Sequence, residues 1–441
     1  MRSVAPRAAV WLVPVLLLVF VFGVLLRPAM SSPLIAIAAI CVVLGIIITS
    51  VFGAERTSMG ALVLAFGLAP LGSFTLGSRY FLVADAVLLV AFTLAIPRLL
   101  HRRLRLPAVF VTGALLFTAF GILTLAGTTV GGSAFVITAV FALVILPAMV
   151  VWMAPNDRQM FAMALAFGIG TAISTLIGLP RNEFRNSGYT YHPVALAYTA
   201  MLTLSFVPFL LASKSSIKWV ATPVLAAIAL VGVWTSGSRT GLVVLAGLLV
   251  LIPLLERSIL LGLVVAAGGV LLLPRILTYD PTAGSTNALS RLFGTGGSRG
   301  SDDARLQGLN DALGQIQANP VFGNGYTVEH TYTIHNVYLQ VLAAEGVFGF
   351  LGFVLMLAAL VVPLRRATSP QRYLAYPAVA VILAGPFQPN MADHYLALTL
   401  GLSLMAAVGV MKHKPPPNQV PASHPQPGAT PVVPEARLSA W

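Results

Sequence analysis

The chain has 441 residues, of which 58% are hydrophobic and only 9% are charged. A soluble protein of this length could not bury so much apolar surface, so the composition excludes a soluble class and predicts an integral membrane protein. The formal net charge is +13, and one cysteine, Cys41, is present. No long basic face suggests nucleic-acid binding, and a lone cysteine excludes an intramolecular disulfide.

Hydrophobic segments recur along the whole chain. A spanning helix needs about 20 mostly apolar residues. By this measure the sequence predicts an all-α polytopic membrane protein with about 12–14 transmembrane helices. The predicted spans start near Ala8, Leu34, Met59, Phe81, Ala108, Ala134, Gln159, Pro193, Trp219, Thr240, Ser258, Asn336, Tyr373 and Tyr395.

Basic residues in short loops set the predicted orientation, because cytoplasmic loops carry an excess of lysine and arginine. Placing both termini in the cytoplasm puts all of the basic clusters on that side. These clusters are 101–105, Lys214 with Lys218, Arg365 with Arg366, and Lys412 with Lys414. We therefore expect a membrane domain over residues 1–413, followed by a disordered, proline-rich cytoplasmic tail over 414–441.

The longest predicted loop, residues 275–335, is then external. Within it, Leu306, Leu309, Leu313 and Ile316 recur at spacings of three and four, which predicts an amphipathic helix lying at the membrane surface. Ser301 or Asp302 is expected to cap the start of this helix, and Asn319-Pro320 is expected to end it.

The predicted outer side carries arginine but no lysine. Arg185 lies in a short polar loop, and Arg239 lies in a Ser-Gly-Ser turn at the start of a span. An arginine fork beside a helix N-terminus and small residues could hold a diphosphate. Two other interpretations stay open. One is codon bias against lysine. The other is that the arginines extend toward lipid headgroups, and it applies more strongly to Arg305 because exposed amphipathic helices often carry arginine.

Titratable residues suggest further chemistry. His335 ends the long loop directly before a span and could act as a base, or it could cap the helix. Asp85 and Glu345 lie within predicted spans. They could form part of a proton pathway, or they could be buried, hydrogen-bonded carboxyls. No Asp-x-Asp or His-x-x-x-His spacing appears on the outer side, so we predict neither a metal nor another cofactor.

Four stretches in a characteristic order resemble the O-antigen ligase and Wzy-type polymerase superfamily of bacterial envelope glycosyltransferases. They lie between about Arg181 and Gly349, and helices flank them on both sides. The stretches are 184–193 (FRNSGYTYHP), 235–241 (TSGSRTG), Arg305 followed by 319–325 (NPVFGNG), and 335–349 (HNVYLQVLAAEGVFG).

The resemblance implies a C-type membrane glycosyltransferase that is inverting and needs no metal. It would move a glycan from undecaprenyl diphosphate to an acceptor hydroxyl at the outer face of the bacterial cytoplasmic membrane. Catalytic roles carry over to Arg185, Arg239 and His335. Further substrate-binding candidates are Arg305, Asn336, Tyr189, His192 and Ser238 in the same stretches, and Arg181 shortly before the first of them.

Four functions remain open on the sequence, and one of them is a structural partner of an envelope assembly complex, for which the purified chain would show no activity. A ligase would use a separate glycan or glycolipid acceptor, whereas a Wzy-type polymerase would join lipid-linked repeat units. A non-enzymatic permease or flippase would need polar residues along a path through the membrane, and the predicted spans are poor in them.

Overall fold

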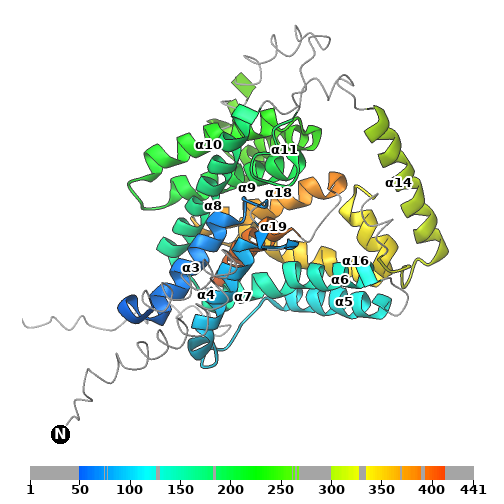
Figure 1. Ribbon diagram of the computed structural model, residues 1–441, viewed down its shortest axis with the longest axis horizontal. Helices are drawn as coiled ribbons and strands as arrows, with labels where there is room; N and C mark the ends of the chain where they lie inside the picture. Colours follow the sequence, from blue (N-terminus) through cyan, green and yellow to red (C-terminus); the bar gives the residue numbers. More distant parts are fainter. Residues whose placement is uncertain are drawn as a thin grey trace, which may run out of the picture.

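The computed structural model describes residues 49–73, 75–76, 78–125, 130–181, 185–260, 262–263, 266–267, 299–326, 334–367, 370–388 and 393–412. These residues form helices joined by turns, with a short two-stranded hairpin between the first two described helices (Figure 1). The predicted all-α membrane fold is confirmed, because the described part contains six helices long and apolar enough to cross a membrane. They are Gly132–Met153, Asp157–Gly178, Pro193–Ala212, Lys218–Thr235, Arg239–Glu256 and Val337–Arg366.

The helices follow one another in the order that hydropathy predicts. Those before the central group are α3 (Ala54–Leu68), α4 (Val83–Leu99), α5 (Ala108–Thr124), α6 (Val130–Val140) and α7 (Leu146–Met153). The central group is α8 (Asp157–Gly178), α9 (Pro193–Ala212), α10 (Lys218–Thr235) and α11 (Arg239–Glu256). The later helices are α14 (Arg299–Ala318), α16 (Val337–Val361), α17 (Pro363–Arg366), α18 (Tyr376–Ala384) and α19 (His394–Lys412).

The number of spans stays a prediction. The predicted spans starting at Ala8 and Leu34 lie outside the described residues, as does most of the one starting at Ser258. The fourth predicted span begins later than expected, because Phe81 belongs to strand β2 (Ser78–Leu82), which pairs with β1 (Thr75–Leu76).

Small residues let neighbouring helices approach closely. A Cβ added at Gly113 of α5 would lie 2.6 Å from the carbonyl oxygen of Gly352 in α16. Likewise, a Cβ at Gly170 of α8 would lie 1.9 Å from the carbonyl oxygen of Gly67 in α3. Helices in membranes associate through such backbone contact, because lipid tails leave little hydrophobic drive between them.

Helix α16 is broken near its middle by Gly346, which has φ 68° and ψ −170°. Segment 320–325, which follows α14, hydrogen-bonds to the backbone on both sides of this break. The Gly325 N–H donates to the carbonyl of Ala344 at 2.9 Å, and the Val347 N–H donates to the carbonyl of Pro320 at 3.0 Å. The two glycine-containing motifs of the sequence, 319–325 and 345–349, are therefore partners in one contact.

A buried pair of side chains, Tyr326 and Glu345, also links these two segments. The Tyr326 hydroxyl donates to Glu345 Oε1 at 2.9 Å. Burial and the neighbouring Glu345 carboxyl raise the pKa of the Tyr326 phenol well above its ordinary value. The phenol therefore keeps its proton for this bond, and Glu345 is a buried, hydrogen-bonded carboxyl, the second of the two interpretations that its sequence position left open.

We expect Gly346→Ala to lower the free energy of unfolding by about 3 kcal/mol or more. The backbone conformation at this position is unfavourable for alanine, and the added Cβ would overlap a neighbouring atom. The Cβ would lie 2.1 Å from the Val321 carbonyl oxygen. A lowered midpoint of thermal unfolding in detergent would measure the effect. Gly314→Ala is the matched control, since its Cβ meets nothing within 4 Å. Equal midpoints for the two variants would contradict the docking.

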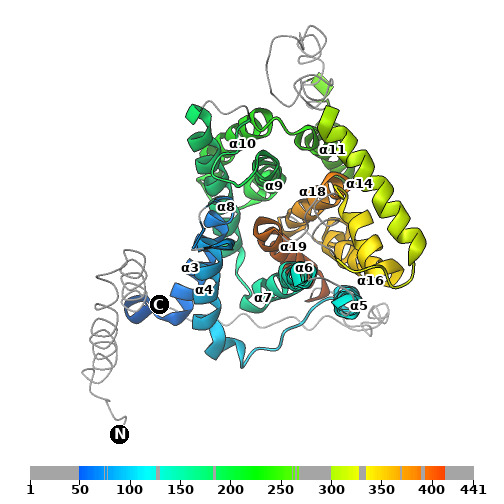
Figure 2. The ribbon, with the colours of Figure 1, turned by 45° about the vertical axis from the view of Figure 1, so that its right-hand side comes forward.

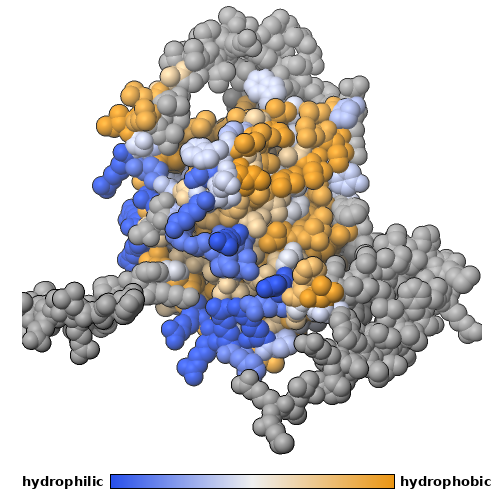
Figure 3. Space-filling model, turned by 90° about the vertical axis from the view of Figure 1, so that its left-hand side faces the viewer, coloured by the Kyte–Doolittle hydropathy of each residue, from blue (hydrophilic) through white to orange (hydrophobic). Residues whose placement is uncertain are grey.

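One end of the bundle is strongly polar. Figure 3 views the left-hand end of Figure 1, and hydrophilic residues gather on part of that face. Here the indole Nε1 of Trp152 donates to the carbonyl of Arg102 at 3.0 Å. Arg372 pairs with Glu256 at 3.1 Å. The predicted cytoplasmic clusters 101–105 and 214–218 lie on connections at this end, and the orientation itself stays a prediction.

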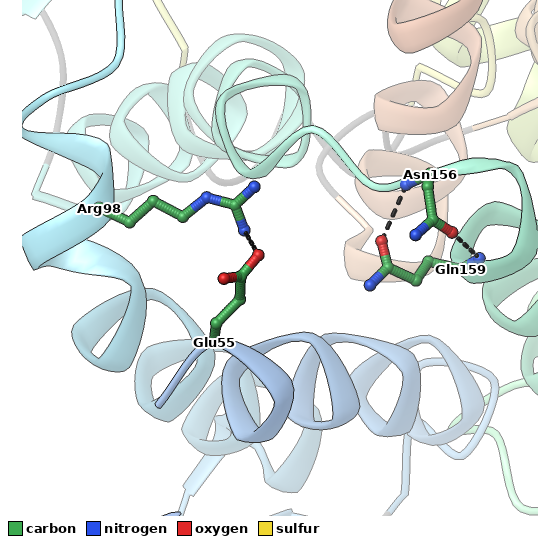
Figure 4. A network of polar contacts seen from close by, with 4 residues as sticks. All are labelled: Glu55, Arg98, Asn156 and Gln159. Atoms are coloured by element: carbon green, nitrogen blue, oxygen red, sulfur yellow. Dashed lines mark hydrogen bonds and ion pairs between the residues drawn. The ribbon is translucent and has the colours of Figure 1, made fainter. Parts of the chain in front are cut away.

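Helix starts at this polar end follow sequence signals. Asn156 and Gln159 form a reciprocal capping box, in which the Gln159 N–H donates to Asn156 Oδ1 at 2.9 Å and the Asn156 N–H donates to Gln159 Oε1 at 2.8 Å (Figure 4). Arg98 pairs with Glu55 in the same view and links the end of α4 to the start of α3. The hairpin between α3 and α4 therefore lies at the opposite end.

Candidate functional site

The loop between α8 and α9 is held to the bundle by Asn186. Its Nδ2 donates to the Thr235 hydroxyl at 3.1 Å, and its backbone N–H donates to the Thr235 carbonyl at 3.0 Å. Its Oδ1 accepts from the Gly188 N–H at 2.7 Å. This buried amide, which directly follows Arg185 in the chain, thus holds the loop against the end of α10.

Arg185 reaches the turn that carries Arg239. The Nε of Arg185 donates to the carbonyl of Ser236 at 2.9 Å. Gly237 then takes φ 62°, a left-handed conformation that favours glycine. The turn ends at Ser238, whose buried hydroxyl accepts from the Gly241 N–H at 3.2 Å and caps α11. Arg239 is the first residue of α11 and is partly buried, so the structure brings the two predicted arginines to neighbouring positions.

An acidic residue, Asp393, joins the starts of α9 and α19. Its two carboxylate oxygens accept from the Tyr191 hydroxyl at 2.7 Å and from the Tyr395 hydroxyl at 2.6 Å. Asp393 and Arg305 both act electrostatically on the phenol of Tyr198 in α9. Arg305 of α14 and Asp393 therefore both lie within electrostatic range of Tyr198.

Tyr198 is 3% exposed, and its hydroxyl has no hydrogen-bond partner within the described part of the chain. A buried hydroxyl without a partner is costly to maintain. It lies where the guanidinium of Arg305 and the carboxylate of Asp393 act on it, so a polar group of a ligand could satisfy it. Sequence reasoning missed Tyr198, because a tyrosine within an apolar span carries no distinguishing pattern.

The predicted helix of the long loop is present as α14, and Asn319-Pro320 does follow its last residue, Ala318. Its start was predicted wrongly. The helix begins at Arg299, before the predicted caps Ser301 and Asp302, so both of these residues lie inside the helix.

His335 lies at the start of α16, directly before the cap. Asn336 caps α16 by accepting from the Leu339 N–H at 3.1 Å. The Tyr338 hydroxyl donates to the carbonyl of Ile382 at 2.8 Å, which fixes the first turn of α16 to the end of α18. The structure thus places His335 at the same end of the bundle as the arginines, on a separate helix.

Four helices begin at this end: α9, α11, α16 and α19. The N-terminus of a helix carries partial positive charge and free N–H groups, which favour anions. Arg185, Arg239 and Arg305 add three full positive charges, and Asp393 offsets one of them. An anionic ligand such as a diphosphate suits the resulting field.

The other predicted substrate-binding residues have different surroundings. The Tyr189 N–H donates to the Ser174 hydroxyl at 2.9 Å. His192 caps α9 by accepting from the Val194 N–H at 3.1 Å through Nδ1. Arg181 ends a short 3-10 helix, and its side chain lies outside the described residues. Substrate contact at these residues, and at Ser238 and Asn336, stays a prediction.

The comparison with protein families bears on the part of the chain that contains most of this site. Residues 199–354 match the family model for O-antigen ligase. This segment of the chain is similar to the O-antigen ligase family. This match confirms the resemblance seen in the sequence. No curated protein matches the chain.

The matched range covers about a third of the chain and runs from α9 into α16. It contains Arg239, Arg305 and His335. Arg185 precedes the matched range and contacts it through Ser236. Asp393 follows the matched range, and Asp393 and Arg305 act on the same phenol, that of Tyr198.

Proposed function

We propose that this protein is an O-antigen ligase-like glycosyltransferase. It moves a glycan from undecaprenyl diphosphate to an acceptor hydroxyl at the outer face of the cytoplasmic membrane. The observation that carries the proposal is the convergence of Arg185 with the Arg239 turn, at the end of the bundle where α16 of the range matched to the O-antigen ligase family begins with His335.

The arginines would neutralise the diphosphate. A guanidinium binds phosphate oxygens through two parallel N–H bonds, which gives both charge and direction. In the reaction, the bond between the anomeric carbon and the phosphate oxygen breaks, and negative charge grows on the leaving diphosphate. Donors placed at that oxygen stabilise the transition state more than the ground state, and this lowers the barrier.

His335 would act on the acceptor. The acceptor oxygen attacks the anomeric carbon from the face opposite the diphosphate, so the configuration inverts. As the new bond to carbon forms, the hydroxyl proton passes to the imidazole of His335, which is a competent base near neutral pH. The products are the glycosylated acceptor, protonated His335 and undecaprenyl diphosphate, so atoms and charges balance.

The test is glycan transfer by the purified chain in liposomes, with undecaprenyl-diphosphate glycan, candidate acceptors and excess chelator. We expect a product whose rate of formation does not change when the chelator is added, because arginines replace the metal as the source of positive charge. Loss of the product with chelator, restored by Mg²⁺, would overturn the metal-independent mechanism.

The form of the product decides between the related functions. A single glycan joined to a separate acceptor indicates a ligase, and a ladder of repeat units indicates a polymerase. If no product forms although the authentic donor binds, the enzymatic proposal fails. Measured passage of the donor across the same liposomes would then support the permease.

A further inference from the structure

Helix α14 presents three faces, which its exposure pattern separates. Gly308 and Ala312 are buried and Arg305 is partly buried, so these residues face the bundle. Leu306, Leu309 and Leu313 are 59%, 39% and 45% exposed. At about 100° of turn per residue, the leucines lie about 100° around the helix from the bundle face.

The third face of α14 is polar. Asp303, Gln307 and Asn310 are all exposed and lie roughly opposite the bundle face, so the leucines lie between the bundle face and the polar face. A helix surrounded by water on its outer side would not separate leucines from polar residues in this way. Three distinct faces fit a helix at a boundary, with protein, lipid and water as its three neighbours.

The position of α14 agrees with such a boundary. Figure 1 shows α14 running across the direction of α5 and α16, and Figure 2 shows it at the rim of the bundle beside α16 and α18. α5 and α16 are apolar helices, and α16 is long enough to cross a membrane. A helix that runs across them at their outer end lies along the membrane plane rather than through it.

The segment that directly follows α14 packs on apolar helices through an aromatic cluster. Phe322, four residues after α14 ends, stacks on Phe120 of α5 with ring centroids 6.2 Å apart. Phe120 in turn stacks on Phe348 of α16 at 5.2 Å. Phe322 and Phe348 are 57% and 43% exposed, and Leu351 of α16 is exposed beyond them.

We propose that the face of α14 formed by Leu306, Leu309 and Leu313 is a lipid-binding surface that inserts among the acyl chains of the outer leaflet. The occupant follows from position, because the segment that directly follows α14 packs through Phe322 on Phe120 of the apolar helix α5, and Phe120 packs on Phe348 of the long apolar helix α16. Lipid on the leucine face and water on the polar face together fix the rotation of α14, and that rotation keeps Arg305 against the bundle.

The test measures where each face lies, by spin labels on the full-length chain in liposomes without donor. Cys41 is the only cysteine and is first replaced by serine. Leu309→Cys and Leu313→Cys report the apolar face, and Gln307→Cys and Asn310→Cys report the polar face. Leu351→Cys gives a lipid reference, and Arg105→Cys gives a water reference.

We expect the leucine-face labels to collide several-fold more often with oxygen, which concentrates in lipid, than with a water-soluble nickel complex. The polar-face labels should show the reverse ratio. Equal access of the nickel complex to both faces would show that α14 stands clear of the membrane. Shielding of the leucine face from both reagents would show that protein covers it. Either result overturns the proposal, and neither depends on the transfer reaction.

Discussion

Replacing Arg239 by lysine is expected to lower the rate of glycan transfer by about 100-fold or more, comparable to removing a donor that stabilises charge in a transition state. Lysine keeps the positive charge at the start of α11 but removes the planar fork that can grip two phosphate oxygens. The measurement is the initial rate of product formation in liposomes, at donor concentrations high enough to separate kcat from KM.

Arg105→Lys is the matched control, because Arg105 is exposed on the α4–α5 connection at the opposite end of the bundle. Its rate should equal that of the unaltered protein. The thermal midpoint of Arg239→Lys should also stay near that of the unaltered protein, since the cap of α11 is made by Ser238. Full activity of Arg239→Lys would remove the arginine from the diphosphate clamp.

Much of the fold is predictable from the sequence because helix positions follow local signals. Hydropathy locates the spans, the Asn156–Gln159 pair begins α8, and Asn319-Pro320 ends α14. The break at Gly346 is different. A glycine inside an apolar run looks like a helix-packing residue, and its left-handed conformation becomes necessary only because segment 320–325 hydrogen-bonds to the backbone on both sides of it.

Candidate site residues that lie in short sequence motifs were predictable. Residues brought together from distant parts of the chain were not. Arg185 and Arg239 lie in polar turns at the ends of predicted spans, and this position made them candidates. Asp393 and Tyr191 are 202 residues apart in sequence, and no periodicity or spacing links them. Asp393 nevertheless accepts hydrogen bonds from Tyr191 and Tyr395 and so links the starts of two helices.

The orientation of α14 is a third feature that bears on what the sequence can predict. Leucine periodicity correctly predicts an amphipathic helix, and the usual expectation is that the apolar stripe packs inward. Here the small residues Gly308 and Ala312 are buried against the bundle, and the leucines remain exposed. Periodicity gives the faces of a helix but does not decide which of them meets protein when lipid is also available.

Replacing His335 by alanine is expected to lower kcat by about 100-fold to 10,000-fold, the usual contribution of a positioned general base. The change removes the group that takes the acceptor proton, but leaves the arginines and the helix N-termini that would bind the donor. KM for the donor should therefore change little. The measurement is the steady-state rate as a function of donor concentration, with the acceptor in excess.

Two comparisons separate a base from a residue that only supports the fold. His101→Ala removes an exposed histidine at the polar end of the bundle and should leave the rate unchanged. Added imidazole should partly restore transfer by His335→Ala, because a small base can enter the space that the side chain leaves, whereas it cannot repair a misfolded helix. Because Asn336 caps α16 independently of His335, the variant should unfold at an unchanged temperature. An unaltered rate in His335→Ala would instead assign proton removal to another group, and Asp393 is then the nearest alternative that the structure offers at the arginine-rich end.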